Sequence, residues 1–310
     1  MPEGLWVASL TPLDADFGCD TRRLADHCRF LLAAGCDGIA LFGTTGEGPS
    51  FTARERRRAL EAVIGAGIAP DRIILGTGCP AIPDTIELSR AAAEAGCAGS
   101  LVLPPFFFKG VDGEGVFRAF ARIAEGVRHS AAKLYLYNIP SVSAVALDYE
   151  TIERLACTFP GVIAGVKDSS LDWSYTAPLL ERFPDLAIFV GAEHHIPQAL
   201  RAGAAGTICG LANVAPRRIR ALYDAVDAEA VRAPLAEVET MLAAIEPHFF
   251  VTALRAIAAA QSGDAAWRRV RPPLYPLDAA AEQQLLASLA PLHLDAMPAS
   301  PHVEAIDATR

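Results

Sequence analysis

Lysine is scarce in this 310-residue sequence, and basic residues as a whole are outnumbered by acidic ones. Of the 27 basic side chains only three are lysines, against 36 acidic residues, which gives a formal net charge of −9. A protein that binds nucleic acid or an anionic membrane surface needs a basic face. The acidic balance therefore argues against a nucleic-acid partner and against a membrane partner.

Cysteine pairs, targeting signals and long apolar runs are missing as well. The seven cysteines are odd in number, widely spaced and without a C-x-x-C motif, which favours neither a disulfide framework nor a zinc site. The chain does not open with a basic segment followed by an apolar one, as a signal peptide would. No stretch approaches the ~18 uninterrupted apolar residues of a membrane span. We therefore expect a cytoplasmic protein with reduced thiols.

The sequence is rich, by contrast, in short apolar runs separated by helix-like segments. Apolar residues make up 52% of the chain, enough for a large core. Runs without polar alternation are typical of strands buried on both faces, as in parallel sheets. Eight of them predict an α/β fold, a closed (β/α)8 TIM barrel, with a doubly wound open sheet as the alternative. The runs are 5–10, 38–42, 73–76, 100–103, 134–137, 162–166, 187–190 and 207–209.

Helix signals fall between these runs. Thr52 and Glu55 have the spacing of a capping box that opens a helix. Glycines that are typical of helix ends stand a few residues before three of the runs, at Gly35, Gly96 and Gly203. This alternation of strand and helix signals supports the barrel prediction.

About 100 residues follow the eighth run. They begin with Pro216, which suits a helix start, and remain helical in pattern to about Gly263. A proline-rich break over 271–277 precedes a last helical stretch, 279–289. The sequence therefore predicts a barrel over residues 1–225, a C-terminal helical extension over 226–296 and a flexible tail over 297–310.

Only one of the three lysines stands where a barrel enzyme places its chemistry, at the carboxyl end of a strand. Lys133 directly precedes the fifth run and Lys109 follows a phenylalanine run, whereas Lys167 directly follows the sixth run and so ends the strand expected there. Burial disfavours the ammonium form of a lysine there, so the neutral amine becomes available to attack a carbonyl. The alternative is an ordinary salt bridge between Lys167 and its neighbour Asp168.

Hydroxyl groups end two further runs. Tyr137, at the end of the fifth run, is either a proton shuttle or an anchor for the end of the strand. Thr44 and Thr45 follow the second run, with Gly46 after them. They are either turn residues or a cradle in which hydroxyl and backbone N–H groups bind a carboxylate.

Other catalytic motifs are incomplete. The loop 43–48 lacks the lysine of a P-loop, 76–78 lacks the third glycine of a dinucleotide fingerprint, and no G-x-S-x-G elbow occurs. His194 and His195 are adjacent, but neighbours on a helix point about 100° apart and no H-x-x-x-H accompanies them. We therefore expect no metal site.

Four motifs lie at the second, fifth, sixth and eighth runs: GTTGE at 43–47, LYNIP at 136–140, GVKDSS at 165–170 and GTICGLAN at 206–213. Their order and spacing resemble the dihydrodipicolinate synthase / N-acetylneuraminate lyase family over roughly residues 5–290. The resemblance implies a class I aldolase or lyase without metal or separate cofactor. It also implies a 2-oxo acid such as pyruvate as substrate, together with an aldehyde or sugar acid, and a homotetramer or homodimer.

The same resemblance implies roles for individual residues. Lys167 would form a covalent imine with the 2-oxo group, which then stabilises the carbanion at C3. Tyr137 would shuttle a proton between that centre and the substrate hydroxyl, with the Thr45 hydroxyl orienting it. The pyruvyl group would be bound by Thr44, Thr45, Gly46 and the backbone around Ile208.

Two positions depart from the dihydrodipicolinate synthases. Those enzymes follow the strand-five motif with an arginine that binds the carboxylate of the second substrate, and this chain has Val142 there. They also relay protons through a tyrosine of a neighbouring subunit, where this chain has Phe107. A valine cannot replace a bidentate guanidinium–carboxylate pair, so lysine biosynthesis is disfavoured.

Polar residues near strand seven indicate the substrate instead. Sialic-acid lyases also carry an apolar residue at the position of Val142 and bind a long polyol after strand seven. This chain offers Gly191, Glu193 and His194 there, with Ser169 beside the lysine, which favours a shorter polyhydroxy chain. The sequence thus predicts an aldolase, or a related dehydratase, for a 2-keto-3-deoxy sugar acid, closer to those aldolases than to true dihydrodipicolinate synthases. The alternatives are a 4-hydroxy-tetrahydrodipicolinate synthase, which joins pyruvate to aspartate semialdehyde, and a non-enzymatic 2-oxo-acid-binding protein.

Overall fold

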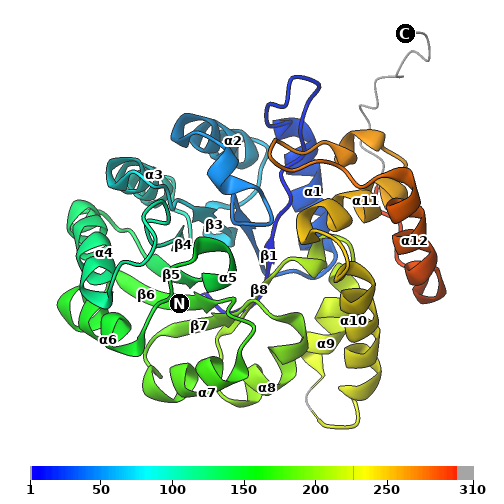
Figure 1. Cartoon of the computed structure of the whole chain (residues 1–310). Coiled ribbons are helices and arrows are strands. Elements are labelled where there is room, and N and C mark those ends of the chain that lie inside the picture. The colour runs from blue at the N-terminus through cyan, green and yellow to red at the C-terminus, as the bar shows by residue number, and fades with distance from the viewer. Residues whose placement is uncertain (1, 226, 299–310) are drawn as a thin grey trace.

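Eight parallel strands, taken in chain order, close into a barrel in the computed structural model, which describes residues 2–225 and 227–298 (Figure 1). The barrel closes where Gly4 and Leu5 of the first strand pair with Gly206 and Thr207 of the last. The TIM-barrel prediction is confirmed, and the open-sheet alternative is wrong. The strands are β1 (Gly4–Ala8), β2 (Gly38–Leu41), β3 (Ile73–Gly76), β4 (Gly99–Val102), β5 (Leu134–Asn138), β6 (Ile163–Asp168), β7 (Ala187–Val190) and β8 (Gly206–Cys209).

Helices surround the barrel and cover its strands from outside (Figure 1). Thr52 caps its helix through the predicted box with Glu55. The three predicted helix-end glycines all have a positive φ, which a residue with a side chain rarely adopts. The helices are α1 (Thr21–Ala33), α2 (Ala53–Gly65), α3 (Ile82–Glu94), α4 (Gly113–Val127), α5 (Pro140–Ser143), α6 (Tyr149–Thr158), α7 (Trp173–Arg182), α8 (Ile196–Arg201), α9 (Pro216–Asp224), α10 (Arg232–Ile245), α11 (Phe250–Ser262) and α12 (Ala279–Leu289).

Large aromatic side chains fill the inside of the barrel, and two of them pack against a glycine of the neighbouring strand. A Cβ placed on Gly38 would lie 2.3 Å from the ring of Trp6, and one placed on Gly99 would lie 2.4 Å from the ring of Tyr135. Because side chains alternate along a strand, Tyr135 and Tyr137 of β5 share the inner face. The interior of the barrel is therefore filled by side chains, and Tyr137 lies at the end of this packed interior that is nearer the carboxyl ends of the strands.

The C-terminal helices lie beside the barrel, next to α1 and α9 (Figure 1). Helix α11 is buried along most of its length, and Phe250 at its start contacts Gly210, just beyond β8. The predicted boundary between barrel and extension falls at residue 226, between α9 and α10 and outside the described residues. Met297, which we expected in the tail, is packed into the core, and residues 299–310 lie outside the described part.

No single helix in the described part of the chain is long and apolar enough to cross a membrane. Helices α10 and α11 reach that length and composition only when taken together, and they are bent by 109° at their junction.

Candidate active site

The register between β5 and β6 brings Lys167 and Tyr137 together. The two residues are directly paired across the strands, and Lys167 Nζ lies 3.3 Å from Tyr137 Oη. The same Nζ lies 4.4 Å from the centre of the tyrosine ring. Each residue is only 3% exposed. The structure therefore joins the two residues that the sequence picked out at separate strand ends.

Asp168 does not pair with Lys167. Its carboxylate accepts hydrogen bonds from Asn138 Nδ2 at 2.9 Å, from Thr176 Oγ1 at 2.6 Å and from Ser170 Oγ at 3.0 Å. Neighbouring residues of a strand point to opposite faces, so Asp168 faces away from the side of β6 that carries the lysine. Among the described residues no carboxylate lies within ion-pair distance of Lys167, and the salt-bridge alternative is wrong.

The other two lysines are exposed and occupied elsewhere. Lys109 Nζ donates to the carbonyl oxygen of Ser143 at 2.9 Å, and Lys133 Nζ donates to that of Gly161 at 2.6 Å. Lys167 is thus the buried lysine of the three. Its amine lies inside the barrel against the hydroxyl of Tyr137, whereas those of the other two lysines bond to backbone carbonyl groups at the surface.

Thr44, not Thr45, contacts the tyrosine. Its Oγ1 lies 3.2 Å from Tyr137 Oη, whereas the Thr45 hydroxyl faces Gly210 at the end of β8, 3.2 Å from where a Cβ on that glycine would stand. Adjacent residues of a tight turn point in different directions, and the residue pattern did not show which one meets the tyrosine. Thr44, and not Thr45 as expected, thus extends the row of polar atoms that runs from Lys167 Nζ through Tyr137 Oη.

The turn that carries both threonines is closed and tightly packed. The Gly48 N–H donates to the carbonyl oxygen of Gly43 at 3.0 Å, and the Glu47 N–H donates to that of Thr44 at 3.0 Å. A Cβ placed on Gly46 would lie 2.6 Å from the carbonyl oxygen of Ser9. Only glycine fits at this position, so Gly46 fixes the turn against the segment that follows β1.

Three predicted residues line the ends of β6, β7 and β8. Ser169 lies two residues after Lys167, and a Cβ placed on Gly191 would lie 2.1 Å from the serine Oγ, so the absence of a side chain at Gly191 makes room for the serine. The Gly191 N–H donates to the carbonyl oxygen of Asp168 at 2.7 Å. Ile208 is fully buried inside the barrel. Ser169 and Gly191 therefore lie side by side, next to the lysine strand.

Glu193 is buried and holds the backbone at the end of β8. Its Oε1 accepts the N–H groups of Gly210 at 3.1 Å and Leu211 at 2.9 Å. Burial raises the pKa of this carboxyl group. Its position in the sequence did not reveal these contacts, because Glu193 follows β7 whereas Gly210 and Leu211 follow β8.

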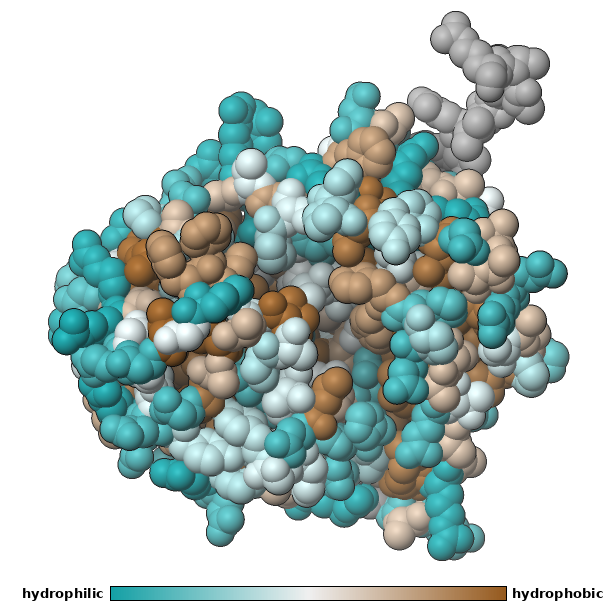
Figure 2. Space-filling model, viewed as in Figure 1, coloured by the Kyte–Doolittle hydropathy of each residue, from teal (hydrophilic) through white to brown (hydrophobic). Residues whose placement is uncertain are grey.

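Exposed apolar side chains lie on the loops and the short helix that follow β4, β5 and β6. Val142 on α5 is 61% exposed, Phe107 is 73% exposed, and Phe108 and Leu171 are exposed as well. Figure 2 shows apolar residues gathered over and beside α5. The rings of Phe107 and Phe108 meet edge to face, with their centroids 5.2 Å apart. The valine at position 142 is therefore accessible but offers no charge to a ligand.

The two adjacent histidines stand on a short turn after β7. Their ring centroids are 4.2 Å apart, and the His195 ring packs edge-on against Trp173. The described residues contain no cluster of three histidine, cysteine or acidic side chains placed to hold a metal ion.

Sequence reasoning missed several residues that hold the site. Asn138 and Asp168 stand inside the LYNIP and GVKDSS motifs, and their hydrogen bond ties the ends of β5 and β6 together. Glu47 stands inside GTTGE and forms an ion pair with Arg255, which no short motif could indicate because 208 residues separate them.

Comparison with known proteins decides the family. The model of the dihydrodipicolinate synthetase family matches residues 1–291. The chain belongs to this family. An uncharacterized DapA-like lyase from Chloroflexus aurantiacus is 37% identical over 281 residues, which is 89% of this chain and 92% of that protein.

Solved structures of this family superpose closely. The dihydrodipicolinate synthase of Agrobacterium tumefaciens str. C58 is 35% identical with a TM-score of 0.87, over 94% of this chain and 99% of that one. A Sulfolobus 2-keto-3-deoxygluconate aldolase is 22% identical with a TM-score of 0.83, over 94% and 96%, a likeness that shows the shared fold. The chain is accordingly a dihydrodipicolinate synthetase family lyase built on a TIM barrel.

Proposed function

We propose that the chain is a Schiff-base aldolase that breaks or forms the C–C bond at C3 of a pyruvyl unit, with a 2-keto-3-deoxy sugar acid as substrate. The observation that carries this proposal is a row of three polar atoms. Lys167 Nζ lies 3.3 Å from Tyr137 Oη, and Tyr137 Oη lies 3.2 Å from Thr44 Oγ1. A buried amine that no carboxylate of the described residues pairs with supports attack on a carbonyl. A phenol in contact with it supports proton transfer.

The reaction follows from these positions. The amine of Lys167 attacks C2 of the 2-oxo acid, and Tyr137 donates its proton to the departing hydroxyl, so that water leaves and a protonated imine and a phenolate remain. The Tyr137 phenolate takes the proton of the C4 hydroxyl as the C3–C4 bond breaks, and the bonding electrons pass into the imine to give an enamine while the aldehyde departs. Tyr137 returns this proton to C3 of the enamine, and addition of water to the imine, which gives one proton back to Tyr137, releases pyruvate and the amine.

The turn around Thr44, Thr45 and Gly46 is the proposed cradle for the carboxylate of the 2-oxo acid. Hydroxyl and backbone N–H groups bind anions without any net positive charge. The net charge of −9 repels anionic substrates at long range, so their attraction must be local. Ile208, Ser169 and Gly191 are proposed to complete the walls of the pocket, and no metal or separate cofactor takes part in the proposal.

Val142 supports the choice of substrate. An apolar side chain at this exposed place cannot bind a second carboxylate, whereas a sugar chain needs only hydroxyl partners such as Ser169 and the residues around Glu193 and His194. A dehydratase for the same class of acid would use the same imine. The second candidate, a 4-hydroxy-tetrahydrodipicolinate synthase, is favoured by the 35% identity to the Agrobacterium protein.

The assembly is proposed to be a homotetramer or homodimer. Exposed Phe107 and Phe108 form an aromatic pair of the kind that protein interfaces bury. Phe107 carries no hydroxyl, so it cannot extend the proton path from Tyr137. Sedimentation velocity at micromolar concentration tests the assembly, and a monomer would contradict it.

Substrate screening tests the proposed reaction. The purified protein is assayed for pyruvate release from a panel of 2-keto-3-deoxy sugar acids, and for condensation of pyruvate with aspartate semialdehyde. We expect turnover of at least one sugar acid and none with the semialdehyde. Preference for the semialdehyde would support the second candidate. Binding of pyruvate without turnover of any panel member would support the 2-oxo-acid-binding alternative instead.

A further inference from the structure

A buried ion pair joins the threonine turn to the C-terminal extension. Glu47 ends the GTTGE motif, and Arg255 lies on α11; their side chains are 2% and 1% exposed. Arg255 Nη2 donates to Glu47 Oε1. The bond thus connects the turn after β2 to a helix that follows the whole barrel in sequence.

The same guanidinium holds the turn from two sides. Arg255 Nη2 also donates to the carbonyl oxygen of Thr11 at 2.6 Å, and Thr11 Oγ1 donates to the carbonyl oxygen of Gly46 at 2.8 Å. One side chain of α11 therefore fixes Glu47 directly and Gly46 through Thr11. These two residues directly follow Thr44 and Thr45, the residues of the carboxylate cradle.

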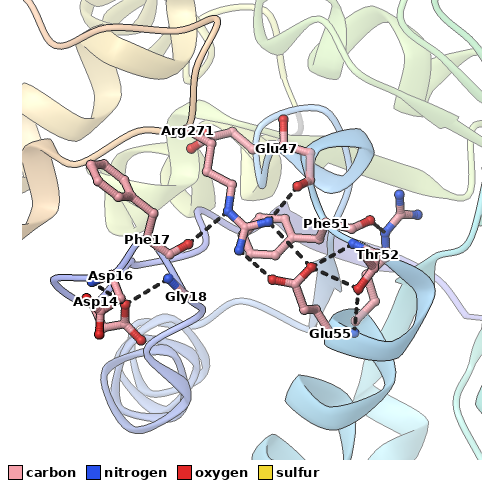
Figure 3. A network of polar contacts seen from close by, with 11 residues as sticks. Asp14, Asp16, Phe17, Gly18, Glu47, Phe51, Thr52, Glu55 and Arg271 are labelled. Atoms are coloured by element: carbon pink, nitrogen blue, oxygen red, sulfur yellow. Dashed lines mark hydrogen bonds and ion pairs between the residues drawn. The ribbon is translucent and has the colours of Figure 1, made fainter.

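Arg271, which also lies in the C-terminal region, makes a second contact with Glu47. The backbone N–H of Arg271 donates to Glu47 Oε2 at 3.0 Å, so both carboxylate oxygens are occupied. The Arg271 side chain continues to Glu55 on α2 and to the carbonyl oxygen of Phe17. Figure 3 shows Arg271 lying between Glu47 and Glu55.

The backbone at Glu47 needs such support. Its φ is 54°, in the left-handed region that residues with a side chain rarely adopt. Such a conformation persists where the surroundings hold it in place, and it is concentrated at functional sites. When the carboxylate loses its partners, the turn is free to relax toward ordinary dihedral angles, which displaces Thr44 and Thr45.

We propose that Arg255 and Glu47 are positioning residues for the carboxylate cradle, so that helix α11 sets the affinity of the site for the carboxylate of its 2-oxo acid. Neither residue is assigned a contact with the reacting atoms. The inference rests on the proposed function, because it takes the turn at Thr44 and Thr45 as the place where that carboxylate binds.

Borohydride trapping with two carbonyl compounds separates positioning from simple stability. Pyruvate carries the carboxylate, and acetaldehyde forms an imine with the same lysine but has no carboxylate to place in the cradle. The half-saturating concentration of each is measured for the wild type, for Glu47→Gln and for Arg255→Lys. Arg23→Met is the matched control, because Arg23 also joins the barrel to the extension, through Asp264 at 2.9 Å, and contacts none of the cradle residues.

The expected result is a shift for one compound only. In Glu47→Gln the half-saturating pyruvate concentration rises roughly ten- to a hundredfold, as for a lost hydrogen bond between charged groups. Arg255→Lys keeps the charge but not the forked geometry and gives a smaller rise in the same direction. Half-saturation by acetaldehyde stays within about twofold in both variants, and the control shifts neither compound.

Other outcomes separate the two proposals. If the wild type forms no adduct with pyruvate on Lys167, the proposed function fails. If the wild type reacts and Glu47→Gln has unchanged half-saturation, or both compounds shift together, only the positioning role is overturned. Should a single variant fail to fold, Glu47→Gln/Arg255→Met leaves no unpaired buried charge and is tested in the same way.

Discussion

Two regions at the carboxyl end of the barrel each bury a basic side chain, and the neighbours of that side chain differ between them. Where β5 and β6 meet, Lys167 has a phenol as its neighbour. Where α11 meets the turn after β2, Arg255 has the carboxylate of Glu47. An amine can react as a nucleophile, whereas the guanidinium of Arg255 keeps its charge and is paired with a carboxylate. The first region is thereby suited to chemistry and the second to support.

The same substitution in both regions is therefore expected to have opposite consequences. Lys167→Met is expected to lower turnover by at least about 10⁴-fold, because no other group can form the imine. Its free energy of unfolding should stay equal to that of the wild type or rise, since no carboxylate loses a partner. Steady-state assays and urea unfolding measure the two quantities. A variant that folds and keeps its turnover would refute the role of the lysine.

Arg255→Met is expected to destabilise the fold by about 3–5 kcal/mol, because it leaves Glu47 buried without its charged partner. Adding Glu47→Gln should recover most of this loss. Urea unfolding of the two single variants and the double variant measures the coupling. Additive losses would mean that the two side chains do not depend on each other.

The two tyrosines of β5 differ in the contacts of their hydroxyl groups, which allows the role of Tyr137 to be tested. Tyr137→Phe should lower turnover by about 10²–10⁴-fold and leave imine trapping intact, because only the proton transfer is lost. Tyr135 is the matched control, since its hydroxyl is buried with no hydrogen-bond partner among the described residues. Tyr135→Phe should change neither turnover nor trapping, and equal effects of the two variants would contradict the assigned proton path.

Another buried basic group, His27 on α1, makes the stability of the fold depend on pH. Its Nε2 lies 2.9 Å from Asn213 Oδ1, and burial lowers the pKa of its ring from 6.5 to about 4. The folded state then binds fewer protons than the unfolded state between these values, so stability is full above pH 6.5 and falls as the pH drops toward 4. At pH 5 the loss is about 2 kcal/mol.

His27→Gln keeps a donor for Asn213 and cannot titrate, so it should flatten this part of the pH profile. Urea unfolding at pH 7 and pH 5 tests the point. An unchanged acid limb in the variant would assign the loss of stability to other groups.

The strands were predictable because each is a compact apolar run, and the observed bounds lie within two residues of those runs. The placement of Lys167 and Tyr137 at the mouth of the barrel was predictable because both residues stand at the carboxyl ends of apolar runs. The contact between Tyr137 and Thr44 was not predictable, because the direction of a side chain in this turn depends on packing against distant segments. The Glu47–Arg255 pair depends on the closure of the whole barrel, which brings α11 to the turn after β2.

The central claim is that Lys167, the buried lysine, is the nucleophile. Borohydride reduction in the presence of pyruvate, followed by peptide mass mapping, tests it most directly. We expect one adduct, on the peptide that contains Lys167, and none in Lys167→Met. An adduct on Lys109 or Lys133, or no adduct at all in the wild type, would contradict the account.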